Sequence, residues 1–307
     1  MNVRLLPSNL QSYAIKECKE DPSRVPEDVA HIREWLTKQP HLKTRTDDQW
    51  ILRFLRGCKF SLDKTKEKLN NFYTLRSALP EFFANRDPYL PKIQQILQLG
   101  AILPIDVPEG PKVLLHRTTN IDPSQVLLID VIKVWSMIAD IMLNEDDHGA
   151  IYGYRIIIDL DTLNANHLLQ ATPIVTKKVV VCLKNVYPYR LKGAYFINMP
   201  SIFESILNLG KVLVGKKLSS RITVISKDSI QSLCEHVPIS ALPVEYGGCG
   251  ETLEELTVKW KHKVESYKEW FLEEATCGCD ESKRISESYT PSDSFGINGS
   301  FRKLNID

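Results

Sequence analysis

The chain has 307 residues, of which 43% are hydrophobic and 25% are charged. This composition is typical of a folded globular protein and excludes collagen, coiled coil or disorder as the main architecture. Lys and Arg number 39 against 38 Asp and Glu, which gives a formal net charge of +1. A general nucleic-acid binder would be more basic. The N-terminal sequence lacks an apolar stretch of signal-peptide length, and no run approaches the ~18 apolar residues of a membrane span.

The seven cysteines favour a reduced, cytoplasmic protein, because their number is odd and their spacing irregular. Cys277 and Cys279 form the one tight pair in the sequence, and no second pair accompanies them to complete a zinc site. We therefore expect no metal ion and no cofactor. We also expect a monomer that does not bind nucleic acid.

The first hundred residues are predicted to be helical. Apolar residues recur at helical spacing after Pro26, then over 51–55 and again over 69–79. Thr46 and Gln49 have the spacing of a capping box at the start of the second of these helices.

After residue 100, short β-rich runs alternate with helical segments. The runs cover 112–117, 155–160, 193–198 and 221–226. Because the connections are long enough for helices, we predict an α/β fold with a mostly parallel sheet. Asp122 and Pro123 are expected to open a helix that runs to about Leu143. Thr252 and Glu255 form a second capping-box pattern, which predicts a last helix over 252–274.

The enzyme motifs that an α/β chain invites are missing or incomplete. The run from Gly210 to Lys217 fits a phosphate-loop pattern, but Lys217 stands where a Ser or Thr should hold magnesium, and the segment continues a helical pattern. Asp159 and Asp161 lie on one face of a strand end, but no histidine or metal-ligand cluster accompanies them. We expect them to cap and hydrogen-bond, and we predict a non-enzymatic protein with no catalytic residues.

Charge is distributed unevenly along the chain. The window 162–227 carries ten basic residues and one acid, Glu204, so its net charge is +9 and that of the rest is −8. Such a segment can face an anionic membrane or a phosphate-bearing lipid. The alternative is that these basic residues are dispersed over solvated helix positions, which is the favoured interpretation for Lys177, Lys178 and Lys184.

The segment 201–214 is strongly amphipathic. Its apolar residues fall on one broad face, its polar residues fall on the other, and Val212 strays toward the polar side. Such a helix usually faces a core. Here basic residues flank it, with Arg190 and Lys192 before it and Lys216, Lys217 and Arg221 after it. Cations around an apolar face are typical of a membrane-contacting helix, or of a lid over a hydrophobic ligand.

A set of motifs resembles the CRAL-TRIO lipid-binding family, in the branch of the α-tocopherol transfer protein and cellular retinaldehyde-binding protein. In chain order the motifs are Ile51–Arg56 with Phe60–Asp63, Ile158–Leu160, Tyr187-Pro188, Ile197-Asn198-x-Pro200 and Leu242–Gly248. Each is weak alone, but their order and spacing match over residues 30 to 275.

The resemblance implies an N-terminal helical region over 1–95, a lipid-binding domain over 96–277 that includes the C-terminal helix, and a polar tail over 278–307. It also implies a mobile gate helix over an apolar cavity, at 201–214. Cations around the gate would bind a phosphoinositide headgroup. The matching residues are Arg190, Lys192, Lys217 and Arg221, with Lys59 as a substitute for a family arginine that is replaced here by Cys58.

Cavity-lining positions also follow from the resemblance. They are His116, Trp135, Ala139, Ile157, Ala171, Cys182, Leu183, Tyr187, Tyr189, Ala194, Phe203, Ile206 and Gly210. Trp135 and Ala139 stand where the tocopherol protein has serines that help to place the ligand hydroxyl, and His116 stands in place of a tyrosine. The cavity is therefore expected to be apolar, with its polar groups moved.

These features predict a carrier of a tocopherol-, retinoid- or carotenoid-like lipid that docks transiently on phosphoinositide-containing membranes. The alternative is a phospholipid sensor or exchanger for which phosphatidylinositol is the cargo. An α/β enzyme is the third possibility, and no residue constellation supports it.

Overall fold

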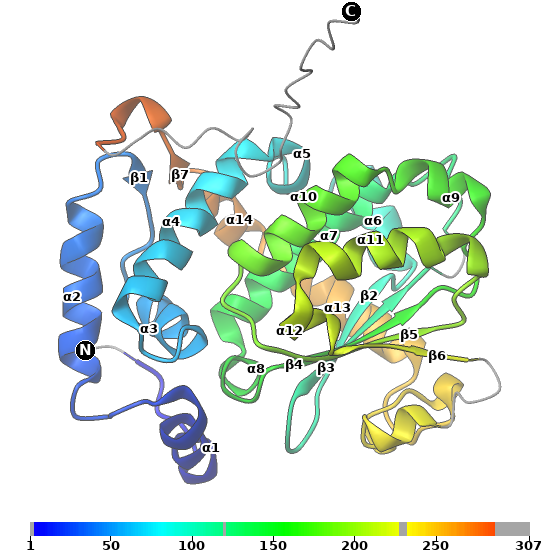
Figure 1. The fold of residues 1–307 in the computed structure, drawn as a ribbon, viewed down its shortest axis with the longest axis horizontal. Coiled ribbons are helices and arrows are strands. Elements are labelled where there is room, and N and C mark those ends of the chain that lie inside the picture. Colours follow the sequence, from blue (N-terminus) through cyan, green and yellow to red (C-terminus); the bar gives the residue numbers. More distant parts are fainter. Residues whose placement is uncertain (1–2, 119–120, 227–231, 286–307) are drawn as a thin grey trace, which may run out of the picture.

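The computed structural model describes residues 3–118, 121–226 and 232–285. Its N-terminal region is helical, as expected (Figure 1). The elements are α1 (Ser8–Tyr13), the π-helix η1 (Ala14–Cys18), α2 (Val25–Thr37), α3 (Asp48–Gly57), α4 (Leu62–Ala78) and α5 (Pro80–Phe83). The predicted cap of α3 is wrong by one residue, because the Asp47 carboxylate, and not Thr46, accepts a hydrogen bond from the Trp50 backbone N–H.

The second part of the chain forms a five-stranded sheet. Its strands are β2 (Ile102–Ile105), β3 (Lys112–Arg117), β4 (Tyr154–Asp159), β5 (Leu191–Ile197) and β6 (Ile222–Ile225), in that spatial order. The pairs from β3 to β6 are parallel, and only β2 runs antiparallel to its neighbour β3. The predicted mostly parallel sheet is confirmed, whereas β2 was not anticipated.

The order of the strands places all the crossover helices on one face of the sheet. Because parallel connections are almost always right-handed, strands added in one direction receive their helices on the same side. These connections are α7 (Leu128–Glu145) with α8 (Asp147–Tyr152), α9 (Ala165–Gln170) with α10 (Pro173–Asn185), and η2 (Ser201–Phe203) with α11 (Glu204–Val214) and α12 (Lys216–Ser219). Figure 1 shows α10 and α11 side by side above the strands.

The opposite face of the sheet packs against the segment 233–242, through Leu233, Val237, Ala241 and Leu242. The 3-10 turn η4 (Val244–Tyr246) follows this segment. Helices α6 (Pro91–Gln98), α13 (Leu253–Ser266) and α14 (Lys268–Glu274) pack beside α7. A two-stranded ribbon of β1 (Leu42–Lys43) and β7 (Gly278–Cys279), followed by the turn η5 (Glu281–Lys283), joins the end of the described chain to the N-terminal region.

Two helix boundaries differ from the prediction. Helix α7 begins at Leu128, because Asp122 accepts a hydrogen bond from the Ser124 backbone N–H and so closes a turn instead of a helix. The predicted helix 252–274 is divided at Tyr267 into α13 and α14. Its capping box of Thr252 and Glu255 is confirmed, with both reciprocal hydrogen bonds present.

The family motifs meet at Asp159, which is buried at the end of β4. Its carboxylate accepts hydrogen bonds from Asn198 Nδ2 (2.9 Å) and from the Tyr246 hydroxyl (2.5 Å). The Asp161 backbone N–H donates to the same carboxylate at 3.2 Å. The predicted hydrogen-bonding role of Asp159 is confirmed, since the carboxylate fastens β4, β5 and η4 together.

A buried carboxylate, Asp140 on α7, joins the N-terminal region to the sheet domain. Arg76 binds both of its oxygens, at 2.6 and 2.8 Å, and Arg86 binds one of them. The Tyr187 hydroxyl donates to Asp140 Oδ1 at 2.9 Å. Burial opposes ionisation of Asp140, but Arg76 and Arg86 outweigh it and hold the pKa of the carboxyl below its usual value.

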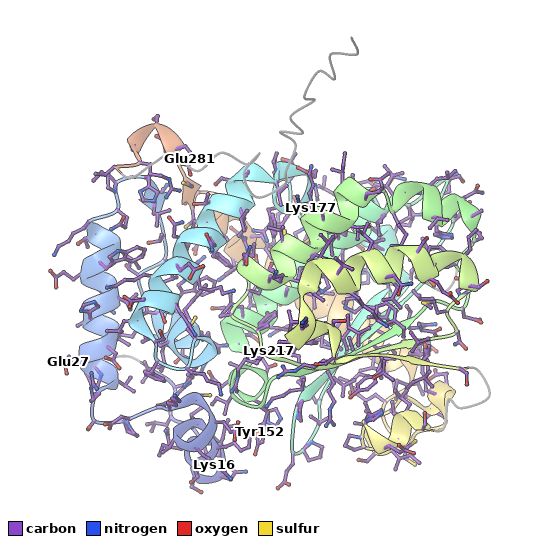
Figure 2. All side chains as sticks on the ribbon, in the orientation of Figure 1. Lys16, Glu27, Tyr152, Lys177, Lys217 and Glu281 are labelled. Carbon is purple, nitrogen blue, oxygen red and sulfur yellow. The ribbon has the colours of Figure 1, made fainter. Side chains whose placement is uncertain are left out.

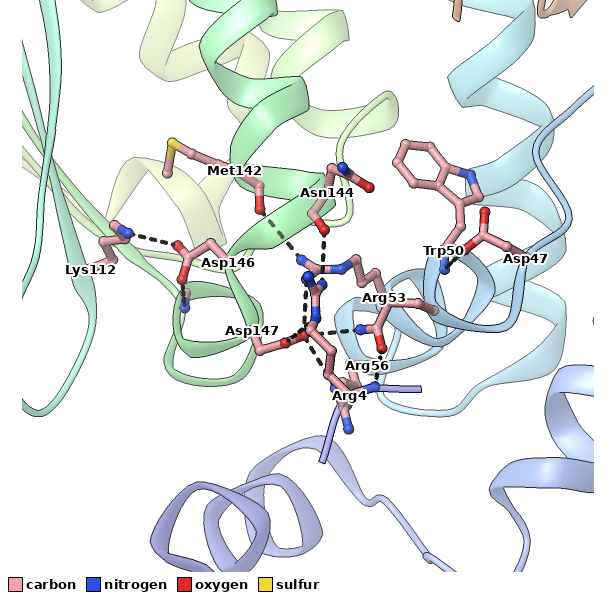
Figure 3. A network of polar contacts seen from close by, with 12 residues as sticks. Arg4, Asp47, Trp50, Arg53, Arg56, Lys112, Met142, Asn144, Asp146 and Asp147 are labelled. Carbon is pink, nitrogen blue, oxygen red and sulfur yellow. Dashed lines mark hydrogen bonds and ion pairs between the residues drawn. The ribbon is translucent and has the colours of Figure 1, made fainter. Parts of the chain in front are cut away.

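A second ion network lies at the start of α8 (Figure 3). Arg4 and Arg53 reach Asp147 at 2.8 and 3.0 Å, while Arg56 forms a two-pronged contact with Glu20 at 2.8 and 3.2 Å. The arginines of the Ile51–Arg56 motif are thus buried and structural. Gly57, just beyond them, allows a close approach, because a Cβ there would lie 2.2 Å from the Pro188 carbonyl oxygen.

Asp140→Asn should lower the free energy of unfolding by about 3–5 kcal/mol, because it removes the carboxylate that two buried guanidinium groups share. Asp130→Asn is the matched control on the same helix, and we expect it to change stability by no more than about 0.5 kcal/mol. Urea denaturation followed by tryptophan fluorescence measures both. Equal stability of the two variants would contradict a central role for Asp140.

Candidate ligand cavity and basic cluster

An apolar cavity lies between the sheet and the crossover helices. It consists of two adjoining parts, chamber 1 of about 400 Å³ and chamber 2 of about 340 Å³. Residues that line both parts are Ile158, Leu183, Phe196, Val214 and Ile222. Each volume falls in the range of small-molecule sites, and most of the lining side chains are hydrophobic.

Alternate residues of the strands form the floor of the cavity. One row across the sheet is Leu114, Ile156, Ala194 and Ile222, and the next is His116, Ile158 and Phe196. Successive side chains of a strand point to opposite faces, so Leu115 and Ile157 pack on the other side of the sheet.

Helix α11 and the preceding turn form the roof of chamber 1. Phe203, Ile206, Leu207, Gly210 and Val214 line the chamber at helical spacing, whereas Val212 is 78% exposed. No residue of α11 is fully buried, although its sequence is as apolar as that of a core helix. The predicted amphipathic face therefore covers a cavity.

Aromatic rings form one wall of chamber 2. The rings of Tyr187 and Tyr189 stack at 5.2 Å with an interplanar angle of 13°. Trp135 meets Tyr187 edge-on at 5.3 Å, and Tyr154 lies 4.6 Å from Tyr189. All four residues line the chamber.

The predicted cavity residues mostly lie where the resemblance placed them. His116, Ala171, Phe203, Ile206 and Gly210 line chamber 1, Leu183 lines both parts, and Trp135, Ala139, Tyr187, Tyr189 and Ala194 line chamber 2. Two residues do not line either part. Ile157 faces the opposite side of the sheet, and Cys182 packs into the core shared with the N-terminal helices.

Most of the predicted basic residues act electrostatically on Lys192 of β5. Burial lowers the pKa of the Lys192 ammonium, and the charges of Arg190, Arg221 and Lys59 lower it further, whereas Glu17 opposes them. Three of the five predicted cations therefore lie close enough to a fourth, Lys192, for their charges to act on it. Lys217 is exposed on α12, four residues before Arg221 (Figure 2). We call Lys59, Arg190, Lys192, Lys217 and Arg221 the basic cluster. Lys227, also in the positive window, lies outside the described residues.

Local backbone geometry positions this cluster. Gly153 has a positive φ of 91°, and a Cβ there would lie 2.4 Å from the Arg190 carbonyl oxygen and 3.0 Å from the Lys192 side chain. The Arg221 guanidinium donates to the Leu191 carbonyl, and Arg190 Nη2 donates to the Ala150 carbonyl at 3.3 Å. Arg190 Nε is buried and has no hydrogen-bond partner in the part of the chain that the structure describes.

Two family models match the chain. A CRAL/TRIO domain model matches residues 106–248, and a Pinta-like UBA domain model matches residues 21–93. Residues 106–248 therefore form a CRAL-TRIO domain. Members of this family bind hydrophobic lipids. The predicted domain limits at residues 95 and 277 stay a prediction; α6 lies across the first of them and packs with the sheet domain.

Curated relatives of this CRAL-TRIO protein cover most of the chain. The mouse α-tocopherol transfer protein-like protein is 29% identical over 272 residues, which are 88% of this chain and 78% of that protein. Clavesin-1 of Xenopus laevis is 26% identical over 76% of this chain and 70% of its own. The solved structure of Sfh5 covers 89% of this chain and 99% of its own, with a TM-score of 0.51 at 15% identity, and supports the fold.

The structure adds site residues that the resemblance did not supply. The floor residues Leu114, Ile156 and Ile158 follow from strand alternation once β3 and β4 are recognised. Glu17 in η1 reaches the basic cluster from a segment far away in sequence. No signal in the sequence places that segment beside Lys192.

In the part of the CRAL-TRIO chain that the structure describes, no group of His, Cys, Asp or Glu side chains is suited to hold a metal ion. None of the described helices combines the length and the apolar character of a membrane span. Gly210 lies inside α11 and not in a strand-to-helix loop, so the phosphate-loop pattern has no structural counterpart.

One hydrogen bond within the described residues joins α11 to a neighbouring element. Lys184 Nζ, at the end of α10, donates to the Leu213 carbonyl in the last turn of α11 at 3.2 Å. The Lys184 carbonyl accepts from Lys68 Nζ of α4 at 2.5 Å. A cation at a helix C-terminus also meets the negative end of the helix dipole. Lys184 therefore links the C-terminal end of α11 to α10 and α4.

Lys184→Met should speed amide hydrogen exchange in α11 by about fivefold to tenfold, because a hydrogen bond of this kind contributes about 1 kcal/mol. Lys177→Met removes the same charge from the same helix and is expected to leave α11 unchanged. Hydrogen–deuterium exchange of peptides covering 204–214 measures the effect. The same exchange rate in both variants would show that Lys184 does not hold α11.

Proposed function

We propose that this CRAL-TRIO protein is a non-enzymatic carrier of a tocopherol-, retinoid- or carotenoid-like lipid. The observation that carries the proposal is the two-part apolar cavity roofed by α11. Burial of one CH₂ group contributes about 0.8 kcal/mol, so a lipid leaves a membrane readily only if such a cavity replaces the lost contacts. The name of the mouse α-tocopherol transfer protein-like relative agrees with this ligand class.

The basic cluster is proposed to bind an anionic headgroup at the membrane surface, with phosphoinositides as its preferred lipids. Arg190 and Arg221 repel the charge of Lys192, and a polyanion bound among the three would relieve this repulsion. Each basic residue near an anionic surface contributes about 1 kcal/mol. The interaction is peripheral and transient, and it leaves the protein cytoplasmic and monomeric between membranes.

An apolar rim near chamber 1 supports contact with the bilayer. Leu127, Leu169 and Ile202 are 52%, 76% and 45% exposed. Each of them precedes a residue that lines chamber 1, namely Leu128, Gln170 and Phe203. Exposed side chains of this size next to a cavity mark an interaction surface. The rim is proposed to enter the lipid while the basic cluster binds headgroups.

The exchange step is proposed to be an outward shift of α11. Its inner face contacts cargo in the closed protein and would contact the bilayer in the docked one. The shift is a population change that the membrane drives only by binding the open form better. Breaking the Lys184–Leu213 hydrogen bond is part of this step, because it joins α11 to α10.

Gly210→Phe should reduce lipid retention at least tenfold, since nothing lies within 4 Å of a Cβ at this position and the new ring fills chamber 1. A glycine inside a helix already costs about 0.5–1 kcal/mol, so folding should tolerate the change. The control Val212→Phe alters the exposed side of α11. Mass spectrometry identifies the lipids retained after exposure to a total tissue lipid extract and gel filtration.

A stoichiometric ring-containing isoprenoid in the unmodified protein and in Val212→Phe, but not in Gly210→Phe, is the expected result. Retained phosphatidylinositol would contradict the proposed carrier of ring-containing lipids and favour the alternative, a phospholipid exchanger. No retained lipid in any of the proteins would contradict a cargo cavity altogether.

Lys217→Glu combined with Arg221→Glu should weaken binding to phosphatidylcholine vesicles that contain phosphatidylinositol bisphosphate. Loss of two cations at about 1 kcal/mol each predicts roughly a 30-fold weaker affinity, and the added repulsion increases the effect. Lipid retention in solution should not change. Lys38→Glu combined with Lys177→Glu makes the same change in net charge elsewhere and serves as the control. Equal vesicle binding by the two double variants would show that the cluster is not the docking site.

A further inference from the structure

Chamber 2 offers ring faces to a ligand but few hydrogen-bonding groups. The hydroxyls of its tyrosines are bound to protein oxygens: that of Tyr187 to Asp140, that of Tyr189 to the Ala139 carbonyl and that of Tyr154 to Asp146. The polar residues Lys184 and Asn185 line its edge at the end of α10, and the Lys184 ammonium already donates to Leu213. Chamber 2 therefore suits an aromatic ring or a conjugated segment, which stacks well on such faces.

Most polar groups of chamber 1 are also engaged within the protein. Thr118 Oγ1 donates to the Asp159 carbonyl at 3.2 Å. Gln170 accepts from the Leu128 backbone N–H at 2.6 Å and donates to the Pro123 carbonyl at 2.8 Å. His167 Nε2 lies 3.0 Å from the Ile121 carbonyl oxygen. These contacts brace the connections around the chamber.

His116 and Arg117 are different. Both line chamber 1, and His116 Nε2 and Arg117 Nε are buried without a hydrogen-bond partner among the described residues. Buried polar atoms are nearly always paired, so an unpaired one points to a partner that arrives later. His116 is the register neighbour of Ile158, one of the residues common to both chambers. With neighbouring strands about 4.8 Å apart, the imidazole lies close to the junction of the two chambers.

We infer that the cargo carries one uncharged hydroxyl or carbonyl group, which hydrogen-bonds to His116, while its ring or conjugated part occupies chamber 2. This assignment rests on the proposed function and specifies the ligand class and its orientation. The polar anchor then lies on strand β3, whereas positions 135 and 139 on α7 carry an indole and a methyl group.

The state of the imidazole agrees with an uncharged partner. Burial lowers the pKa of His116 to about 4, so the ring is neutral at physiological pH. A neutral imidazole offers one donor and one acceptor, which suits an alcohol or a carbonyl. Arg117 also lines chamber 1, next to the Tyr246 hydroxyl that binds Asp159. A ligand with a carboxylate would form an ion pair with the Arg117 guanidinium instead of a hydrogen bond with His116.

Three retinoids of matched shape test the inference: all-trans-retinol, the hydrocarbon that lacks its hydroxyl, and retinoic acid. Their dissociation constants are measured by tryptophan quenching in the full chain, in His116→Phe and in His116→Gln. The ratio of hydrocarbon to alcohol dissociation constants should fall about tenfold in His116→Phe. His116→Gln restores a hydrogen-bonding group and should recover most of the ratio. Because the ratio compares two ligands on one protein, a general loss of stability does not mimic the result.

An unchanged ratio in His116→Phe, with both ligands bound, would overturn the anchor and leave the carrier function standing. Tightest binding of retinoic acid, unaffected by the His116 variants, would also overturn it and point to Arg117. Failure of the unmodified protein to bind any of the three would refute the proposed carriage of ring-containing lipids, and the anchor with it.

Discussion

The buried carboxylate of Asp140 determines how the two parts of this chain fit together. A charge in the protein interior is tolerated only with partners, and here they come from separate elements: Arg76 from α4, Arg86 from the loop after α5 and Tyr187 from the segment before β5. Arg76 also lies 3.7 Å from Glu274 of α14. The N-terminal helices are thereby fixed against the back of chamber 2. The same contact explains why Tyr187 presents its ring, and not its hydroxyl, to the cavity.

The cavity itself follows from strand order and from α11. All the crossover helices lie on one face of the sheet and cover it. Helix α11 does not fill the space between itself and the strands. Gly210 adds no side chain where the roof faces chamber 1, and no residue of α11 is fully buried. An unfilled apolar lining forfeits dispersion contacts that a close-packed core would make. A bound lipid would restore them, so the incompletely packed roof would gain stability from a ligand.

Much of this arrangement could be predicted from the sequence. Local signals predicted the helices of the N-terminal region, the parallel strands and the capping box at Thr252, because hydrophobic period and capping chemistry are local. Most of the cavity residues that the resemblance implied line a chamber. Ile157 faces the other side of the sheet, since a shift of one residue along a strand reverses the direction of the side chain. Cys182 immediately precedes Leu183, which lines both chambers, but its own side chain packs into the core shared with the N-terminal helices.

Other features depend on long-range contacts that no local pattern contains. Asp122 and Pro123 look like a helix start, but the side chain of Asp122 closes a turn first. Glu17 reaches Lys192 only because α1 and η1 fold back against α8, where Tyr13 and Tyr152 meet at 4.2 Å. The pairing of β2 with β3 and the isolation of His116 Nε2 likewise require the assembled sheet.

One helix connects the two proposed binding events, and thermodynamic linkage restricts how they relate. In the proposed exchange step, cargo in chamber 1 would contact the inner face of α11 and favour the closed position, whereas a membrane would favour the open position. Any factor by which docking weakens cargo binding must equal the factor by which cargo weakens docking. The empty protein should therefore hold the membrane more tightly than the loaded one. Under this proposal, a loaded carrier would leave the surface and an empty one would stay to be filled, so transport would need no energy source beyond the difference in lipid content between two membranes.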